Sequence, residues 1–334
     1  MGRRARGRRA PVGAALLAAL AATAACVAAG CTAPHGGGQD GRGGHADRPG
    51  RESGQPRTPR SGHTGPLLAV KIDNVAPARP QTGLAAADVV YAEQVEGGLS
   101  RLLAVYATKL PPVVGPVRSA RESDLELLRQ FGRPTLAFSG AQARLLPLID
   151  AAPLTARTPD DEPDAYFRAA GRAAPHNLFV RPNRLLAAAP GADALPAGFR
   201  YGPAPAGGRP VASRTVRYPA ARFTFTWSAP RRGWQVAMDG AAATTTDSGR
   251  PAPGTVVVQH VRVRRSSLHD RLGNYTPYTR TVGSGTAQVL RDGRVYEAVW
   301  KRPRASDGTD FTTADGAPVN FAAGQVWVVF VPDR

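Results

Sequence analysis

The stretch from Leu68 to Asp124 constrains the fold most, because short apolar runs alternate there with charged residues and Gly/Pro turns. Short apolar runs bounded by turn residues are typical of buried β-strands. We predict strands over Leu67–Ile72, Val89–Val95 and Leu99–Thr108. Polar side chains at strand ends often form binding sites on such scaffolds. The stretch therefore predicts a site at the edge of a sheet.

The glycine pair at 97–98 predicts a tight turn between the second and third of these strands, since primed turns need positive φ. Two registers are compatible with the sequence. A two-residue loop places Gln94 opposite Arg101. A loop that also includes Glu96 places Glu93 opposite Arg101, within reach of an ion pair.

A helix is predicted to begin at Ser119, where Ser119 and Glu122 have the spacing of a capping box. Arg118 and Arg121 would then lie at the positive end of the helix dipole, which disfavours cations by about 0.3–1 kcal/mol each. Negative charge should compensate there. It would come from a bound anion or from the carboxylates of the same stretch, which are Asp73, Glu93 and Glu96.

The chain after residue 210 is dominated by strand patterns, and Asp292-Gly293 predicts a hairpin turn between two of them. We therefore expect an α+β protein, with an N-terminal mixed α/β domain that includes a helix over Ala141–Ile149, followed by a mainly antiparallel β domain. The predicted C-terminal strands are Val211–Tyr218, Phe223–Trp227, Trp234–Met238, Thr255–Val263, Thr286–Leu290, Val295–Trp300 and Val326–Val331.

Residues 1–31 are typical of an export signal, with an arginine-rich start and an Ala/Leu run too short to span a bilayer. The small residues that end at Cys31 resemble the bacterial lipoprotein signal, in which the cysteine is acylated. Two or more acyl chains anchor a protein stably. The sequence therefore predicts a protein anchored through lipid to the extracytoplasmic face of the cell membrane.

The mature chain divides by composition into a tether and two domains. Residues 32–65 are rich in Gly, Arg and Pro and cannot bury enough apolar surface to fold. Domains are expected over 66–210 and 211–334, with an Ala/Pro/Gly-rich boundary. Because both cysteines lie in the signal region, we expect no disulfide in the mature chain.

The formal net charge of +18 does not by itself indicate nucleic acid. A basic protein outside the membrane meets anionic envelope polymers and lipid headgroups. We therefore expect no nucleic-acid partner, and a protein partner is not identified. No nucleophile elbow, zinc signature or phosphate loop is present in the sequence, and no cofactor or metal is expected.

Several motifs resemble the YerB-like bacterial lipoproteins, a two-part domain of unknown function. They are AVKIDN, ARPQTGL, ADVVYAEQVEGGLSR, VGPVRSAR and PHN in the first half, and GSG and GQVWVVFVP in the second. The resemblance covers about Pro66 to Pro332 and implies a surface lipoprotein without an agreed activity. Two departures are that Lys71 stands where the family commonly has an apolar residue, and that Ala92 separates Tyr91 from Glu93.

Three functions are compatible with the sequence. The first is binding of an anionic or glycan envelope ligand, the second a hydrolase that uses two carboxylates as acid and base, and the third a structural partner in an envelope complex. We favour binding, and whether the protein is an enzyme stays open. The candidate site residues are Asp73, Asn74, Glu93, Glu96, Arg101, Arg118, Ser119, Arg121, His176 and Asn177.

Overall fold

The computed structural model describes residues 65–333 except 197, 248, 271 and 272. Cys31, the predicted export signal and nearly all of the predicted tether lie outside these residues. No helix of the described part is long and apolar enough to cross a membrane.

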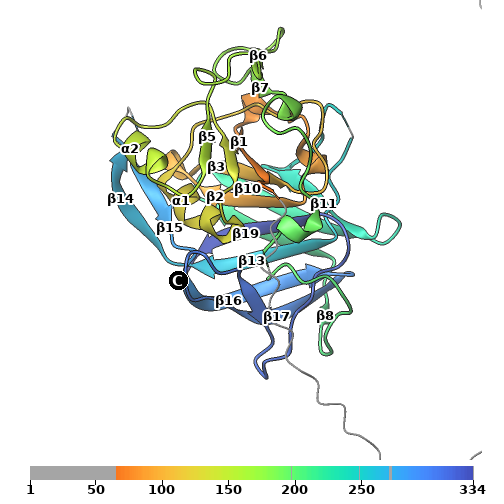
Figure 1. Ribbon diagram of the computed structural model, residues 1–334. Coiled ribbons are helices and arrows are strands. Elements are labelled where there is room, and N and C mark those ends of the chain that lie inside the picture. The colour runs from red at the N-terminus through yellow and green to blue at the C-terminus, as the bar shows by residue number, and fades with distance from the viewer. Residues whose placement is uncertain (1–64, 197, 248, 271–272, 334) are drawn as a thin grey trace, which may run out of the picture. The chain divides into compact units, whose positions relative to one another are not determined.

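An 11-stranded mixed sheet is the main element of the fold (Figure 1). Its order is β18-β17-β16-β13-β19-β2-β3-β1-β4-β5, and β8 pairs with β17 beside this path. The strands are β1 (Leu68–Asp73), β2 (Val89–Gln94), β3 (Ser100–Tyr106), β4 (Thr135–Ala137), β5 (Thr155–Arg157), β8 (Arg209–Pro210), β13 (Thr255–Val261), β16 (Gly283–Arg291), β17 (Arg294–Arg302), β18 (Asp310–Thr312) and β19 (Val326–Pro332).

Three smaller sheets and short helices complete the described fold. The four-stranded sheet has the order β12-β11-β10-β9, and β14–β15 and β6–β7 form two-stranded ribbons. These strands are β6 (Tyr166–Arg168), β7 (Leu178–Val180), β9 (Ser213–Tyr218), β10 (Ala221–Ser228), β11 (Gly233–Met238), β12 (Ala241–Ala242), β14 (Val263–His269) and β15 (Tyr275–Thr279). The helices are α1 (Glu122–Leu128), α2 (Leu146–Asp150) and the 3-10 turns η1 (Ala76–Ala78), η2 (Leu84–Ala86), η3 (Glu96–Gly98), η4 (Arg129–Phe131), η5 (Pro182–Arg184) and η6 (Ala192–Ala194).

Both faces of the large sheet are buried. Along β19, Trp327 and Val329 belong to the core shared with the four-stranded sheet, whereas Val328 and Phe330 belong to the core shared with α1 and α2. Successive side chains of a strand point to opposite faces. A strand covered on both sides is therefore continuously apolar, as the sequence of β19 is.

The predicted α+β class is wrong, because the described fold is mainly β and its α-helices α1 and α2 are short. The predicted helix start at Ser119 fails because the chain before α1 lies alongside β1, where Val117 bridges Ile72. The helix over Ala141–Ile149 shortens because Pro147, which lacks an N–H, fits only in the first turn of α2.

The second half is not a separate antiparallel sheet either, because its last strand enters the first half. β19 pairs in parallel with β13 on one side and with β2 on the other. The division at residue 210 stays a prediction about the chain's organisation. The structure adds that a single sheet runs through both parts.

Two predicted turns are confirmed. The Asp292-Gly293 loop joins β16 to β17 with Arg291 opposite Arg294, and φ is 51° and 71° at its two residues, as a type I′ turn requires. At the turn before β3, Glu93 is paired with Arg101, so Glu96 belongs to the loop. The second of the two open registers is therefore the one adopted.

Candidate functional site

The site begins with a row of charged residues across three neighbouring strands. Asp73 ends β1, Arg101 lies near the start of β3, and Glu93 lies near the end of β2. Cross-strand partners share one face of a sheet. Toward the middle of the same strands, this face carries the apolar residues Leu103 and Tyr91 that pack against α1. The face thus changes from apolar to charged at one edge.

The segment before α1 brings further cations to this edge. The Arg118 N–H donates to Lys71 O at 2.8 Å, and the Asp73 N–H donates to Pro116 O at 2.9 Å. These bonds hold the segment against β1. α1 itself begins at Glu122, with the Arg121 N–H donating to Asp124 Oδ2 at 2.7 Å. Arg118 and Arg121 therefore lie outside the helix, in the segment that leads into it.

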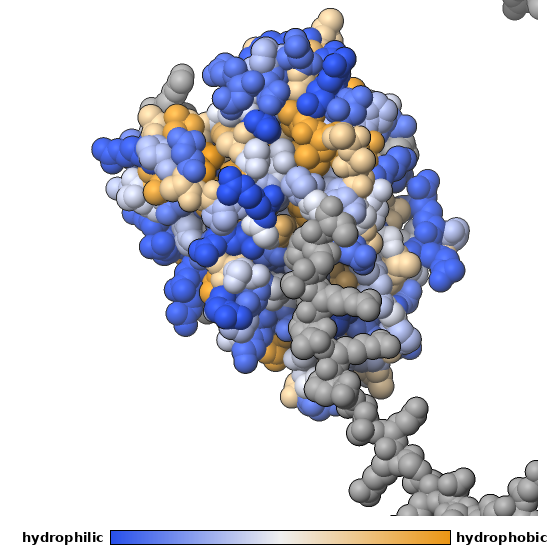
Figure 2. Space-filling view, viewed as in Figure 1, coloured by the Kyte–Doolittle hydropathy of each residue, from blue (hydrophilic) through white to orange (hydrophobic). Residues whose placement is uncertain are grey.

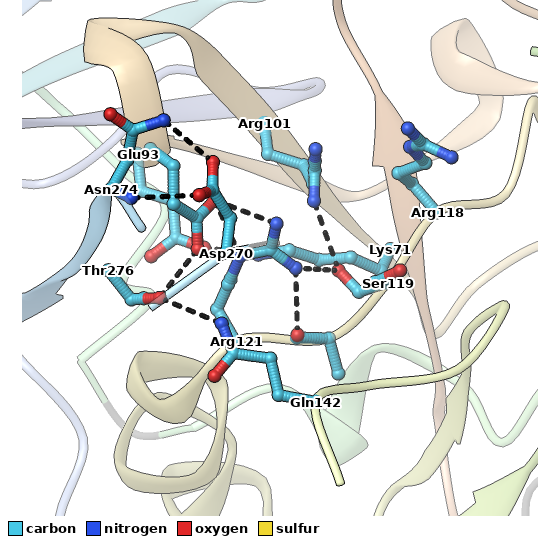
Figure 3. A network of polar contacts seen from close by, with 12 residues as sticks. Lys71, Glu93, Arg101, Arg118, Ser119, Arg121, Gln142, Asp270, Asn274 and Thr276 are labelled. Atoms are coloured by element: carbon cyan, nitrogen blue, oxygen red, sulfur yellow. Dashed lines mark hydrogen bonds and ion pairs between the residues drawn. The ribbon is translucent and has the colours of Figure 1, made fainter. Parts of the chain in front are cut away.

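A cleft of about 900 Å³ lies beside this segment. It brings together three of the predicted site arginines, Arg101, Arg118 and Arg121, and predicted Ser119. Figure 3 shows Arg101 and Arg121 directed at the backbone of Ser119. The rest of the lining is Ala141, Gln142, Ala143, Leu146, Pro175, His269 and Asp270.

Arg121 is fully engaged within the protein. Its Nε and Nη2 donate to Glu96 Oε2 at 3.0 and 2.7 Å, and Nη1 donates to the carbonyls of Ser119 and Ala120. Burial acts to raise the pKa of Glu96, but the hydrogen bonds and charge of Arg121 outweigh it and lower that pKa overall. Thr276 of β15 also donates to Glu96 Oε1 at 2.6 Å. Arg121 is thus an internal ion-pair partner.

Asp73 is buried between a cation and an imidazole. Its Oδ2 lies 3.2 Å from Arg118 Nε and 2.8 Å from His176 Nδ1, and its other oxygen, Oδ1, has no hydrogen-bond partner among the described residues. His176 comes from the turn before β7. That turn is positioned by the bond from the Val117 N–H to Leu178 O at 2.6 Å.

Arg101 is buried with few partners. Its Nη1 makes a long contact of 3.5 Å with Ser119 O, and its Nε has no described hydrogen-bond partner. Burial, together with the positive charge of Arg121, lowers the pKa of Arg101 to about 10. The guanidinium therefore remains charged at neutral pH in surroundings that disfavour a cation.

Comparisons with known proteins identify the family of this chain. Residues 53–195 match the N-terminal domain, and residues 214–328 the C-terminal domain, of the DUF3048 proteins of unknown function. The chain belongs to this YerB-like, two-part family. The protein named "Putative lipoprotein YerB" of Bacillus subtilis (strain 168) is 26% identical over 284 residues, which cover 80% of this chain and 81% of that protein.

A crystal structure of the YerB protein from Bacillus subtilis has the same fold. It matches with a TM-score of 0.65 and 20% identity, covering 80% of this chain and 91% of that one. Together with the two matched family domains and the sequence relative, this structure confirms the predicted family resemblance.

Lys71, noted above as a departure from the YerB-like pattern, has no exposed surface and holds two carboxylates. Its Nζ contacts Glu93 Oε1 and, at 2.6 Å, Asp124 Oδ1. Burial raises the pKa of Glu93, although the charge of Lys71 acts in the opposite direction. The structure thus places Glu93 in a buried cluster with Lys71 and Asp124, and Glu93 does not line the cleft.

The two predicted asparagines serve other contacts. Asn74 is buried, donates to Ser100 Oγ at 2.9 Å and accepts from Gln81 Nε2 at 2.9 Å. Asn177 accepts from Arg168 Nη1 at 2.7 Å and donates to Arg172 O at 3.1 Å. Neither lines the cleft.

Sequence reasoning missed the contribution of the β14–β15 ribbon and of Arg302. Arg302 is completely buried and donates to Glu126 O at 2.8 Å and to Thr281 Oγ1 at 2.7 Å, which ties α1 to the second half. Only the alternation along β17, which places Arg302 on the same buried face as Ala298 and Trp300, could have suggested this. No group of three or more His, Cys, Asp or Glu residues that could hold a metal ion occurs in the described part of the chain.

Proposed function

We propose that this chain is a lipid-anchored envelope protein that binds an anionic or glycan ligand in the arginine cleft. The observation that carries the proposal is that Arg101 and Arg118 line the cleft with guanidinium groups that few acceptors of the protein engage. Among the described residues, Arg101 makes one long hydrogen bond, from Nη1 to Ser119 O at 3.5 Å, and Arg118 forms one ion pair, from Nε to Asp73 Oδ2 at 3.2 Å. Guanidinium donors without acceptors are costly to bury, and a bound anion would accept from those that face the cleft.

The charge around these two arginines favours an anion further. Asp73 faces Arg118 but also contacts His176, while Glu96 is already paired with Arg121. The Asp270 carboxylate on the rim accepts from the backbone and side-chain amides of Asn274 at 2.8 and 2.9 Å. Guanidinium groups bind carboxylate and phosphate oxygens through paired N–H donors. Arg101 and Arg118 are therefore the proposed anion contacts.

The remaining wall of the cleft is suited to the uncharged part of such a ligand. Ala141, Ala143, Leu146 and Pro175 provide apolar surface, and Gln142 provides an amide. Pockets that combine apolar walls with a few polar groups orient small ligands. A sugar or polyol with one anionic group matches this lining.

We expect Arg118→Gln to weaken binding of glycerol 3-phosphate by about tenfold or more. A hydrogen bond to a charged group contributes about 1.5–3 kcal/mol, and 1.4 kcal/mol corresponds to a factor of ten. Isothermal titration calorimetry on the full-length chain in non-ionic detergent measures the dissociation constant. Galacturonate tests a carboxylate in place of the phosphate, and glycerol is the uncharged control.

The matched control is Arg217→Gln, which removes one positive charge from an exposed position on β9. It should leave the affinity unchanged. Equal loss in both variants would mean that net charge alone attracts the anion. If the wild type binds neither glycerol 3-phosphate nor galacturonate, the cleft is a structural ion-pair network. This result would favour the alternative function, a structural partner in an envelope complex.

The lipid anchor is proposed from the Ala-Ala-Gly-Cys sequence that ends at Cys31 and from the name of the relative described above. We expect wild type in the membrane fraction and Cys31→Ser in the soluble fraction, because acyl chains on the cysteine provide the anchoring. Fractionation followed by mass spectrometry of the N-terminal peptide checks this. A Cys31→Ser protein that stays in the membrane would contradict it.

A hydrolase is the second candidate, and one contact favours it. A buried carboxylate that orients an imidazole, as Asp73 does for His176 at 2.8 Å, is the arrangement of a general base. The predicted pair of carboxylates is not available, since Glu93 binds Lys71 and Glu96 binds Arg121. NMR of poly(glycerol phosphate) incubated with the wild type decides this, and absence of cleavage would end the hydrolase candidate.

A further inference from the structure

The β14–β15 ribbon presents an array of exposed arginines that the proposed cleft does not use. None of them forms an ion pair with any residue that the structure describes. They are Arg262, Arg264, Arg265 and Arg280. Solvated arginines need no partner. Four of them on or beside one ribbon, whose strands have seven and five residues, nevertheless concentrate positive charge.

Two of these arginines lie over tyrosine rings. The Arg264 guanidinium carbon is 4.5 Å from the ring centre of Tyr278, and that of Arg265 is 5.0 Å from the ring centre of Tyr275. Tyr275 is 52% exposed. An aromatic ring beside a guanidinium offers a flat surface for a sugar or polyol and donors for an anion at the same place.

Hydrogen bonds join one side of the ribbon to α1, and the arginines of the ribbon remain exposed to solvent. Tyr278 donates to Glu126 Oε2 at 3.0 Å, Ser266 donates to Glu122, and the Thr279 N–H donates to Ser123 Oγ at 2.9 Å. The carboxylates of α1 beneath the ribbon therefore accept hydrogen bonds from it, and none of them pairs with its arginines.

Several hollows border the ribbon, and three of them are lined by the arginines of the cleft or of the ribbon. The arginine cleft reaches its turn at His269 and Asp270. A second hollow of about 460 Å³ lies between the 97–98 glycine turn and the ribbon, and includes Arg264, Arg265 and Tyr275. A third, of about 230 Å³, lies at the far end. Its lining includes Arg262, Arg280, Trp300 and the acidic Asp333.

We infer that the ligand is a linear polyanion, built from sugar or polyol units that each carry a phosphate or carboxylate, and that it runs from the cleft along the β14–β15 ribbon. The inference rests on the proposed function of the cleft and extends it. A small anion would use Arg101 and Arg118 alone. Only a chain with repeated charges also uses the arginines of the ribbon, and its second contact forms at high effective concentration.

One face of the molecule carries mainly hydrophilic side chains, with scattered apolar patches (Figure 2). Ion contacts with a polymer of repeated charge also release counterions, so the affinity should fall steeply with salt. This behaviour separates a polyanion from a single small anion.

The test compares two polymers with their monomers on the full-length chain. The probes are poly(glycerol phosphate) with glycerol 3-phosphate, and oligogalacturonate with galacturonate, so the two arms distinguish a phosphodiester polymer from a uronate polymer. We expect at least one polymer to bind about tenfold or more tightly than its monomer. Arg264→Gln/Arg265→Gln should remove this gain and leave monomer affinity within about twofold.

The matched control is Arg217→Gln/Arg231→Gln, which removes two exposed arginines from the four-stranded sheet and its β10–β11 turn. It should keep the polymer gain. Tyr275→Ala, which leaves the charge unchanged, should weaken polymer binding several-fold. Thermal unfolding verifies that each variant is folded, since exposed substitutions change stability by about 0.5 kcal/mol or less.

The outcomes separate the two proposals. The inference is overturned if the Arg264→Gln/Arg265→Gln variant still binds the polymer more tightly than the monomer, or if the wild type binds both equally. Either result leaves the proposed binding in the cleft unaffected. Ribbon-dependent polymer binding that Arg118→Gln does not weaken leaves the ribbon site standing and overturns the cleft as its starting point. Equal loss in the Arg217→Gln/Arg231→Gln control reduces the effect to net charge and overturns the inference.

Discussion

Lys71→Met should destabilise the protein by about 3–5 kcal/mol. Lys71 is completely buried and is the cation between Glu93 and Asp124. Methionine occupies a similar volume, so the main effect is that two buried carboxylates lose their counter-charge, which costs about this much. Urea unfolding of wild type and variant at neutral pH, with equal slopes, measures the difference.

The loss should depend on pH in a defined direction. Because burial raises the pKa of Glu93 above its ordinary 4.5, the folded state binds more protons than the unfolded state above that pH. Stability contributed by this group is therefore complete below about 4.5 and declines as pH rises toward the raised pKa. Removal of the Lys71 charge raises that pKa further, so the gap between wild type and variant should widen from acidic to neutral pH.

Two further variants make this result specific. Lys109→Met applies the same change to an exposed lysine, and should cost about 0.5 kcal/mol or less. Lys71→Met/Glu93→Gln should recover part of the loss, because Asp124 retains its bond to the Arg121 N–H. A loss below about 1 kcal/mol for Lys71→Met, or a pH-independent loss, would contradict a buried charge cluster.

Trp327→Ala should cost about 3–5 kcal/mol, the usual range for truncation of a fully buried large aromatic residue. Trp327 lies on β19 and packs between the large and the four-stranded sheet, with ring centres 6.2 Å from Phe223 and 5.8 Å from Phe225. The substitution would leave a cavity beside β19, the strand that pairs with β2 of the first half and β13 of the second. Chemical unfolding monitored by far-UV circular dichroism gives the value.

A double-mutant cycle tests the packing itself. Trp327→Ala and Phe225→Ala should couple by about 0.5–1.5 kcal/mol, since the rings meet edge to face. Trp227→Ala is the comparison for the first substitution, because Trp227 is only partly buried on the same core. A loss for Trp327→Ala no larger than that for Trp227→Ala would argue against β19 as the joint between the sheets.

Local sequence patterns were sufficient for the first three strands and for one turn type. Apolar runs bounded by turn residues marked β1, β2 and β3 to within a few residues, and Asp292-Gly293 marked a hairpin. These features depend on φ preferences and on burial of neighbouring residues. The predicted helices failed where tertiary contacts held the chain before α1 along β1 and where Pro147 limited α2.

The sequence by itself also predicted polar side chains at one edge of a sheet, because Asp73 and Glu93 lie at strand ends, whereas the structure decided the register that places Glu93 opposite Arg101. It determined the family, through motifs such as VGPVRSAR. Both depend on residues close together in the chain. The presence of polar residues at strand ends therefore follows from residue order, but their pairing does not.

Only the tertiary structure decided which charge pairs with which, and which donors remain for a ligand. Lys71 meets Asp124 across 53 residues, Asp73 meets His176 across 103, and Glu96 meets Thr276 across 180. The position of β19 between β13 and β2 is decided in the same way. Such contacts form when distant segments pack, and their energies depend on burial and on geometry to within ångströms. Neither the burial of a charge nor the geometry of its contacts can be read from the order of residues along the chain.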